Sequence, residues 1–231
     1  MEALATWREA LAGMLPPGPE IRRVVDLGCG TGRFTGLLAD VYGTSVVGVE
    51  PSSRMLAGRE PLDPARATFL AATAEALPLA TSAIDLVFLS LVYHHLGGQT
   101  AALAELRRVA RAGGHVIVRQ VTRESADEYE YVRFFPDALA LDLRRMPSRD
   151  GLTRAFLTEG FGRAGHRIVR HLFARSYAEY YRKISLRGLS SLQAISDDAF
   201  ARGLAAFERH CRTQGAGPIY EPVELFVFRR T

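Results

Sequence analysis

The sequence of 231 residues contains two cysteines, one tryptophan and a single lysine, Lys183. Cys29 and Cys211 lie far apart and neither belongs to a CxxC pair, which argues against a disulfide framework and against a cysteine metal site. No apolar run approaches the length of about 20 residues that a transmembrane helix requires. The N-terminus also lacks the charged and then apolar layout of a signal peptide. These absences predict a cytoplasmic protein that binds no metal and does not enter a membrane.

The sequence also has only a small excess of positive over negative charge. The formal net charge is +4, and after Thr122, where the excess lies, the two signs alternate along the chain. Binding of nucleic acid would require a basic stripe, so nucleic acid is not an expected partner. Because 48% of the residues are hydrophobic, the chain can build a full core. We expect one domain, residues 1–231, made of an N-terminal helix and linker (1–20), a binding core (21–122) and a later elaboration (123–231).

The stretch from Val24 to Phe34 is the most informative part of the chain. The apolar run from Arg22 to Leu27 is typical of a buried parallel strand, and a helix is expected from Gly32 to Tyr42. Gly28, Gly30 and Gly32 lie between them. Glycines permit positive φ angles and let a ligand approach the backbone, and the helix start beyond them offers free N–H groups. A strand, a glycine turn and a helix in this order predict a ligand-binding edge.

Glycine spacing and charge separate two classes of ligand for this edge. The dinucleotide fingerprint requires glycine at its first, third and sixth positions. Here the sixth position is Arg33, and Asp26 would lie close to a pyrophosphate of the same charge. An acid at this place is better suited to a cationic or zwitterionic ligand. An NAD(P)-dependent oxidoreductase is therefore the less favoured alternative.

The same residues resemble the first motif, (V/L)-(D/E)-x-G-x-G-x-G, of the class I S-adenosylmethionine-dependent methyltransferases. Later segments match in the right order, and the chain resembles the small-molecule branch with a methyltransferase type 11 domain over about half its length. The resemblance implies an α/β fold with a doubly wound, mainly parallel, seven-stranded Rossmann-like sheet, with helices on both faces. It implies S-adenosyl-L-methionine as cofactor and S-adenosyl-L-homocysteine as product. The residues implied at the methionine end are Asp26, Gly28, Cys29, Gly30 and Gly32.

A second acid, Glu50, ends the predicted strand from Ser45 to Val49. It lies about 20 residues beyond the glycines, where an acid can accept hydrogen bonds from both hydroxyls of a ribose. In the resembled family the next residues, Pro51 and Met55, flank the adenine ring. Met55 is equally consistent with an ordinary core residue at the start of a helix.

The third predicted strand, Ala67 to Leu70, leads to further residues on the adenine side. Many relatives read Gly-Asp-Ala-Glu-x-Leu-Pro after this strand, and the acid contacts the adenine amino group. This chain has Thr73 at that position, so the resemblance carries only the backbone amide of Ala74. Glu75 is left with three readings, namely a solvated side chain, a helix cap and a ligand contact.

The fourth predicted strand, Ile84 to Ser90, continues into Leu91 and the pair His94-His95. In the resembled family its end lies under the methionine part of the cofactor and faces the methyl acceptor. No (N/D)-P-P-Y motif for methylation of base amines is present. A histidine here could accept the proton of the acceptor, since its pKa lies near neutral pH. The alternative is one histidine bonded to the backbone and one exposed. No carboxylate or cysteine cluster accompanies the pair, so no metal is expected.

The remaining elements follow from hydrophobic periodicity. A helix over Glu2–Leu15, stopped by Pro16–Pro19, either closes over the ligand or packs on the sheet. After a helix over Gln99–Ala110 and a strand over His115–Val121, a helical insertion between strands six and seven is expected. The other expected elements are helices over Leu139–Leu143, Thr153–Gly160, Tyr177–Leu186 and Asp197–Arg212, and strands over His166–Phe173 and Pro222–Arg229.

The sequence thus predicts methyl transfer from S-adenosylmethionine to a small-molecule acceptor by direct displacement. A cofactor-binding protein without turnover is an alternative of a different class. In the resembled family the acceptor pocket is built by additions such as residues 123–231, and an aromatic set there is a candidate wall or simply core packing: Tyr129, Phe134, Tyr177, Tyr180 and Tyr181. Monomer and homodimer both stay open, and the acceptor is not identified.

Overall fold

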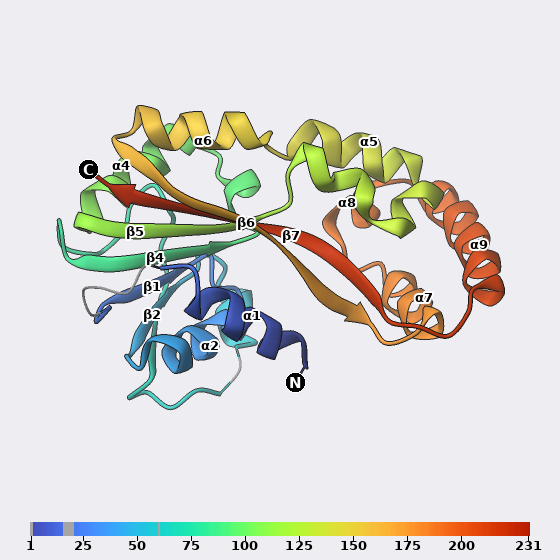
Figure 1. Ribbon diagram of the computed structural model, residues 1–231, viewed down its shortest axis with the longest axis horizontal. Coiled ribbons are helices and arrows are strands. Elements are labelled where there is room, and N and C mark those ends of the chain that lie inside the picture. The colour runs from blue at the N-terminus through green and yellow to red at the C-terminus, as the bar shows by residue number, and fades with distance from the viewer. Residues whose placement is uncertain (1, 16–20, 60) are drawn as a thin grey trace. The chain divides into compact units, whose positions relative to one another are not determined.

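The computed structural model describes residues 2–15, 21–59 and 61–231, and within them seven strands form one sheet in the order β3-β2-β1-β4-β5-β7-β6 (Figure 1). Neighbouring strands from β3 to β5 run parallel, and β7 runs antiparallel to β5. The predicted fold class, a mainly parallel seven-stranded sheet, is confirmed. The strands are β1 (Val24–Leu27), β2 (Val46–Val49), β3 (Ala67–Leu70), β4 (Ile84–Ser90), β5 (Ala110–Gln120), β6 (Phe161–Ala174) and β7 (Ile219–Arg230).

The chain divides into two compact units. The core unit contains Leu4–Gln120, Asp150–Arg167 and Glu224–Thr231. Most of the second unit consists of Val121–Arg149 and Ile168–Val223. Strands β6 and β7 therefore contribute residues to both units. The sequence-based segments 1–20, 21–122 and 123–231 of a single domain stay a prediction.

Helices of the core unit cover the sheet on both faces. They are α1 (Glu2–Ala12), α2 (Arg33–Tyr42), α3 (Ser53–Ala57), α4 (Gln99–Val109) and α6 (Arg149–Thr158). Along β1 the side chains alternate between the two faces, as the geometry of a strand requires. Val25 and Leu27 join the apolar cluster that includes α4 and α6, whereas Asp26 bonds to Thr35 of α2. On the face of the sheet toward which Asp26 points, the ring of Phe34 packs against the rings of both Trp7 and Phe88.

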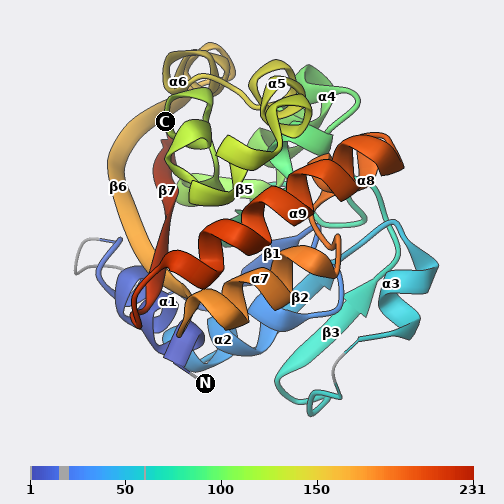
Figure 2. The same cartoon turned by 90° about the vertical axis from the view of Figure 1, so that its right-hand side faces the viewer.

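The second unit builds a core of its own, largely from helices (Figure 2). Helices α7 (Tyr177–Ser185), α8 (Ser190–Ala194) and α9 (Asp197–Thr213) lie between β6 and β7 in the chain, which confirms the predicted helical insertion. Helix α9 packs along α7 in Figure 2, and Phe207 and Tyr180 meet edge to face at 5.1 Å between ring centroids. The remaining elements are the 3-10 turns η2 (Arg123–Glu128) and η3 (Glu130–Phe134) and the helix α5 (Pro136–Arg145).

Several predicted boundaries were wrong, and glycines explain the larger errors. Strand β5 starts at Ala110 rather than His115, because Gly113 and Gly114 form an irregularity within the strand instead of a turn before it. Strand β6 starts at Phe161 rather than His166, and it keeps Gly162 and Gly165 inside the strand. Helix α1 ends at Ala12, three residues before the predicted Leu15. The proposed helix stop at Pro16–Pro19 lies outside the described residues.

No helix within the described ranges is long and apolar enough to cross a membrane.

The packing of α6 on the sheet gives a direct test of the core. Phe156 is fully buried, and its ring stacks on Phe228 of β7 at 4.0 Å between centroids. We expect Phe156→Ala to lower the free energy of unfolding by about 3 to 5 kcal/mol, because a large buried ring leaves a cavity. The adjacent Leu157 is half exposed and serves as the control. Urea titration should show Leu157→Ala within about 0.5 kcal/mol of the parent, and an equal effect of both substitutions would contradict this packing.

Candidate functional site

The glycine turn after β1 is fixed to the end of β2 by backbone hydrogen bonds. The amides of Gly28 and Cys29 both donate to the carbonyl of Val49, at 2.7 and 3.1 Å. Gly28, Gly30 and Gly32 all have positive φ angles, of 69°, 58° and 85°. Such angles strain residues with a Cβ atom, so the sequence requires glycine here for backbone conformation. Gly32 caps α2 without a side-chain hydrogen bond, so the first amides of α2 lie beside the turn.

Two of these glycines also allow close contacts. A Cβ atom on Gly28 would lie 2.3 Å from Cγ2 of Val92, so glycine is needed there for space as well as for its φ angle. A Cβ atom on Gly30 would lie 3.3 Å from the terminal methyl group of Met55, which places Met55 over the turn. The role predicted for Met55, to flank the adenine ring, stays a prediction. Met55 is 38% exposed, so it is not a core residue.

Asp26 places a carboxyl group inside the sheet next to the turn. Its side chain is 1% exposed, and Oδ2 accepts a hydrogen bond of 2.7 Å from the Thr35 hydroxyl. Burial raises the pKa of Asp26 to about 7, the Thr35 bond lowers it, and the nearby Glu50 adds to the rise. A carboxyl group with this pKa is partly protonated at neutral pH. A cation bound beside it would favour the ionised form.

Glu50 is held by backbone amides through both of its carboxylate oxygens. Oε2 accepts from the amide of Gly30 at 3.1 Å, and Oε1 accepts from the amide of Ser52 at 3.0 Å. Ser52 in turn caps α3 by accepting from the amide of Met55. Each carboxylate oxygen can accept more than one hydrogen bond, so further acceptor capacity is present. Binding of a ribose by Glu50 stays a prediction.

Cys29 is buried within the turn and is poorly suited to act as a nucleophile. Burial raises the pKa of its thiol to about 12, and the negative charges of Asp26 and Glu50 add to the effect. The side chain stays a neutral thiol at physiological pH. Cys29 therefore contributes packing and its backbone amide to the turn.

The residues that the sequence predicts beside an adenine follow the ends of β2 and β3 in the chain. Thr73 and Pro51 are exposed, and Ala74 is buried. Glu75 accepts a hydrogen bond of 3.4 Å from the amide of Gly98, which caps α4. Glu75 thus contacts the residue that starts α4, and its contact with a ligand stays a prediction.

The end of β4 has an unusual backbone conformation. Leu91 has a φ angle of 57°, although it is not glycine, and its amide donates to the carbonyl of Arg119 on β5 at 2.8 Å. Residues in this region cost free energy and are concentrated at functional sites. Ser90 accepts a hydrogen bond of 3.1 Å from Nη1 of Arg119.

His94 and His95 lie together in the 3-10 turn η1 (Tyr93–His95), with ring centroids 4.0 Å apart. Nδ1 of His94 lies 3.0 Å from Nε2 and 3.3 Å from Oε1 of Gln120, a fully buried residue of β5. His95 is exposed. The sequence alternative assigned a backbone partner to one histidine, whereas the structure gives His94 a side-chain amide. A proton-accepting role for either residue stays a prediction.

Sequence reasoning missed Arg119. Its side chain is 7% exposed and lies over the rings of Trp7, at 4.2 Å, and Phe34, at 5.2 Å. One signal was available, because Arg119 directly follows the apolar run Val116–Val118 of the strand. A buried arginine at the end of a strand generally needs a specific role.

The aromatic residues of the predicted acceptor wall pack inside the second unit. Tyr180 is fully buried, donates to Oε1 of Glu221 at 3.1 Å and accepts from the amide of Tyr131 at 3.2 Å. The hydroxyl of Tyr177 donates to Glu130 at 3.0 Å. These contacts support the core-packing alternative for the two tyrosines, and a wall function stays a prediction.

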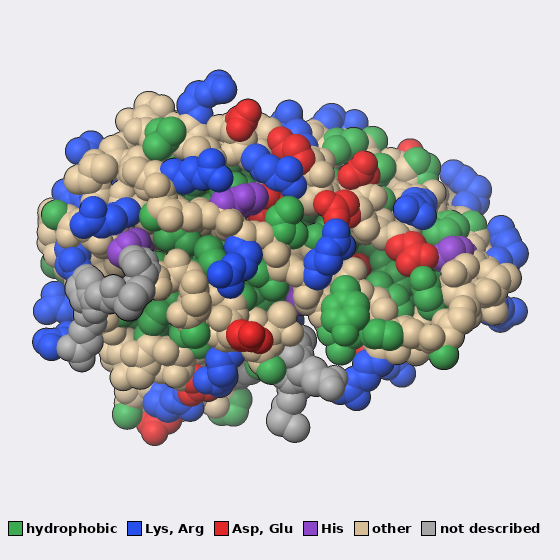
Figure 3. Space-filling view, in the orientation of Figure 1, with side chains coloured by type: hydrophobic (Ala, Val, Ile, Leu, Met, Phe, Trp, Pro, Cys, Tyr) green, Lys and Arg blue, Asp and Glu red, His purple; other side chains and the backbone are tan. Residues whose placement is uncertain are grey.

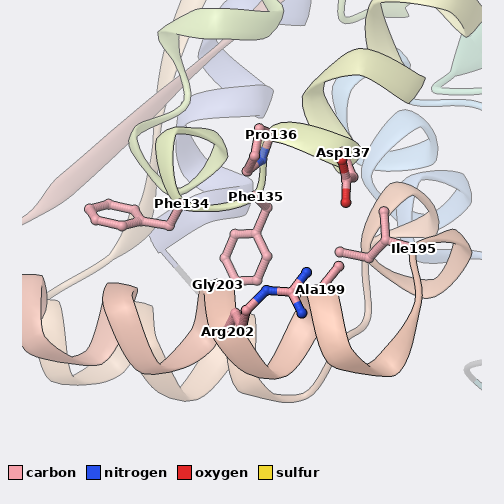
Figure 4. Close-up of a pocket in the computed structure, with 8 residues that line it drawn as sticks. All are labelled: Phe134, Phe135, Pro136, Asp137, Ile195, Ala199, Arg202 and Gly203. Atoms are coloured by element: carbon pink, nitrogen blue, oxygen red, sulfur yellow. The ribbon is translucent and has the colours of Figure 1, made fainter.

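A pocket within the second unit is lined by one member of that aromatic set (Figure 4). Asp137 and Arg202 approach it from α5 and α9. The lining residues are Phe134, Phe135, Pro136, Asp137, Ile195, Ala199, Arg202 and Gly203.

The surface carries side chains of both charge signs. On the face shown in Figure 3, Lys and Arg side chains are interspersed with acidic and hydrophobic ones. Across the part of the chain that the structure describes, no three His, Cys, Asp or Glu side chains gather in a way that could hold a metal ion.

The fold and the sequence around the glycine edge are similar to those of methyltransferases. Residues 25–118 match the family described as methyltransferase domain. A malonyl-[acyl-carrier protein] O-methyltransferase of Methylococcus capsulatus is 34% identical over 110 residues, 46% of this chain and 40% of that protein. A demethylmenaquinone methyltransferase of Beutenbergia cavernae is 36% identical over 114 residues, 49% of this chain and 46% of that protein.

Solved structures agree on the fold. A protein of Anabaena variabilis, assigned as a methyltransferase from an antibiotic biosynthesis pathway, superposes with a TM-score of 0.79 at 19% identity and covers 100% of both chains. The chain spans less than two thirds of the length of the curated relatives it matches. The chain is thus similar to methyltransferases in sequence over residues 25–118 and in fold.

The tight contact at Gly28 gives a matched test of the turn. Gly43, which ends α2, has a similar φ angle of 64° but nothing within 4 Å of a Cβ atom. We expect Gly43→Ala to cost about 1 to 2 kcal/mol of unfolding free energy from the φ angle alone. Gly28→Ala should cost at least about 1 kcal/mol more, since it also overpacks against Val92. Val92→Ala in the Gly28→Ala background should recover part of the loss. If chemical denaturation gave the same loss of unfolding free energy for Gly28→Ala and Gly43→Ala, the close contact of Gly28 with Val92 would be refuted.

The raised pKa of Asp26 predicts a pH-dependent stability. Because the folded-state pKa of about 7 exceeds the usual value, the proton bound to Asp26 stabilises the fold below about pH 4. This contribution is lost as the pH rises through about 7. Asp26→Asn cannot ionise, and its amide oxygen can still accept from Thr35. The melting temperature of Asp26→Asn minus that of the parent should therefore increase from pH 5 to pH 8. A difference that stays constant over this range would show that Asp26 does not titrate in it.

Proposed function

We propose that this chain transfers a methyl group from S-adenosylmethionine to a small-molecule acceptor by direct displacement. The observation that carries the proposal is the carboxylate of Glu50, held by the amides of Gly30 and Ser52 beside the buried Asp26. In this proposal Glu50 accepts hydrogen bonds from hydroxyl groups and Asp26 interacts with a cation, both at the same edge of the sheet.

The residues of the edge fit the cofactor in shape and in charge. The glycine turn offers a surface without Cβ atoms, and a side chain at Gly28 or Gly30 would meet Val92 or Met55. In this proposal the methionine end is held by Asp26, Gly28, Cys29, Gly30, Gly32, Ser90 and Leu91. Glu50 binds the ribose, and the adenine is bordered by Pro51, Met55, Thr73, Ala74 and Glu75.

The bound cofactor supplies an electrophilic methyl group on a sulfonium, with S-adenosylhomocysteine as the leaving group. The chain itself has to orient the acceptor toward this group and exclude water. Ionised Asp26 would stabilise positive charge at the cofactor's amino-acid end, and its buried position strengthens that interaction.

His94 or His95 is the proposed proton acceptor for a weakly acidic hydroxyl or a protonated amine. Gln120 contacts Nδ1 of His94 and thereby fixes the orientation of its ring. Acceptors that are already nucleophilic would need no such base.

The names of the relatives support an acceptor other than nucleic acid. One is named for malonyl groups on acyl-carrier protein and the other for demethylmenaquinone. The proposal names no individual acceptor, and it leaves the monomer and the homodimer as alternatives.

Calorimetric titration tests the proposal. S-adenosylmethionine and S-adenosylhomocysteine should bind in the micromolar range, and NADH should not. Glu50→Gln should weaken S-adenosylhomocysteine binding at least about 10-fold, because hydrogen bonds to a charged group are lost. The matched control is Glu208→Gln, whose carboxylate pairs with Arg212 on α9 in the second unit.

Two outcomes would reject the proposal. Binding of NADH alone would favour the oxidoreductase alternative. Binding of S-adenosylmethionine without transfer of its labelled methyl group to any component of a metabolite extract would favour a cofactor-binding protein without turnover.

A further inference from the structure

Arg119 lies at the level of the glycine turn, on the same face of the sheet as Asp26. In the strand register Leu27 pairs with Leu89, and Ser90 pairs with Arg119. The row formed by Ser90 and Arg119 is therefore next to Gly28, which directly follows Leu27. Asp26 and Arg119 both face the side of α1 and α2, since Asp26 bonds to Thr35 and Arg119 covers Trp7 and Phe34.

The guanidinium of Arg119 is held in place by its surroundings. Nη1 donates to Oγ of Ser90 at 3.1 Å, and the ring of Trp7 lies 4.2 Å away. Aromatic faces stabilise a cation that is partly removed from water. Ordering a guanidinium in advance reduces the entropy lost when it binds an anion, and its planar fork matches a carboxylate with two hydrogen bonds.

The charges around the glycine turn indicate which group of a ligand the guanidinium of Arg119 would bind. Asp26 and Glu50 suit the ammonium and hydroxyl groups of the proposed cofactor, but they would repel its carboxylate. A carboxylate at the amino-acid end therefore needs a cation away from the two acids. Strand β5 lies two strand positions from β1, or about 10 Å, and Arg119 reaches back from it toward Ser90 on β4. The other nearby arginines, Arg33 and Arg54, are exposed on α2 and α3.

We propose that Arg119, stacked on Trp7, binds the α-carboxylate of S-adenosylmethionine. The inference rests on the proposed function and extends it to a residue outside the glycine motif. It also gives α1 a role, because Trp7 of this helix covers the guanidinium that holds the ligand.

Decarboxylated S-adenosylmethionine provides the test, because it differs from the cofactor only by the carboxylate. In calorimetric titrations the parent should bind S-adenosylmethionine at least about 10-fold more tightly than the decarboxylated probe. In Arg119→Met this preference should disappear, while the affinity for the probe stays within about threefold of the parent. Arg119→Lys keeps the charge but not the bidentate fork, and it should retain an intermediate preference. It also serves as the second variant if Arg119→Met does not fold.

A matched control separates binding from stability. Arg187→Met removes another guanidinium from an aromatic ring, that of Phe200 in the second unit, and should leave both affinities unchanged. A preference that persists in Arg119→Met and Arg119→Lys, an equal loss of both ligands, or a parent without preference would each overturn the assignment. A parent that binds neither ligand would instead reject the proposed function itself.

Discussion

The attachment of the glycine turn to the end of β2 is the constraint on which the site depends. Val49 accepts the amides of Gly28 and Cys29, and the carboxylate of Glu50 bridges the amides of Gly30 and Ser52. Two strands, the turn and the start of α3 are thereby fixed to one another before any ligand is present. Because buried and half-buried amides need partners, the same bonds stabilise the loop and orient the acid. Loss of the Glu50 carboxylate would affect loop and ligand together.

Much of the fold could be predicted from the sequence where short apolar runs end at glycine or acid. Strands β3 and β4 have the predicted boundaries, and β1 and β2 differ from them by two residues or fewer. Strands β5 and β6 were predicted too short, because Gly113 and Gly165 interrupt the local pattern. In β5 the pairing with β4 continues on both sides of the glycines, at Ala110 and at His115, and pairing between distant segments cannot be read from a local window.

The candidate site was predictable in its backbone and less so in its buried polar contacts. The positive φ angles of the glycine turn and the position of Glu50 follow from the motif. The contact of His94 with Gln120 and the stacking of Arg119 on Trp7 join residues 26 and 112 positions apart, respectively, and no local spacing specifies them. For Tyr180, composition could not separate a pocket wall from core packing, since both require a large apolar ring.

A crystal structure with S-adenosylhomocysteine would test the central claim most directly. The account predicts ribose hydroxyls within hydrogen-bond distance of Glu50, and the homocysteine amino group on the side of Asp26 and the glycine turn. The amide bonds of Gly30 and Ser52 to Glu50 should persist in that complex. A ligand bound elsewhere, or a Glu50 side chain that turns away from both amides and ribose, would contradict the account.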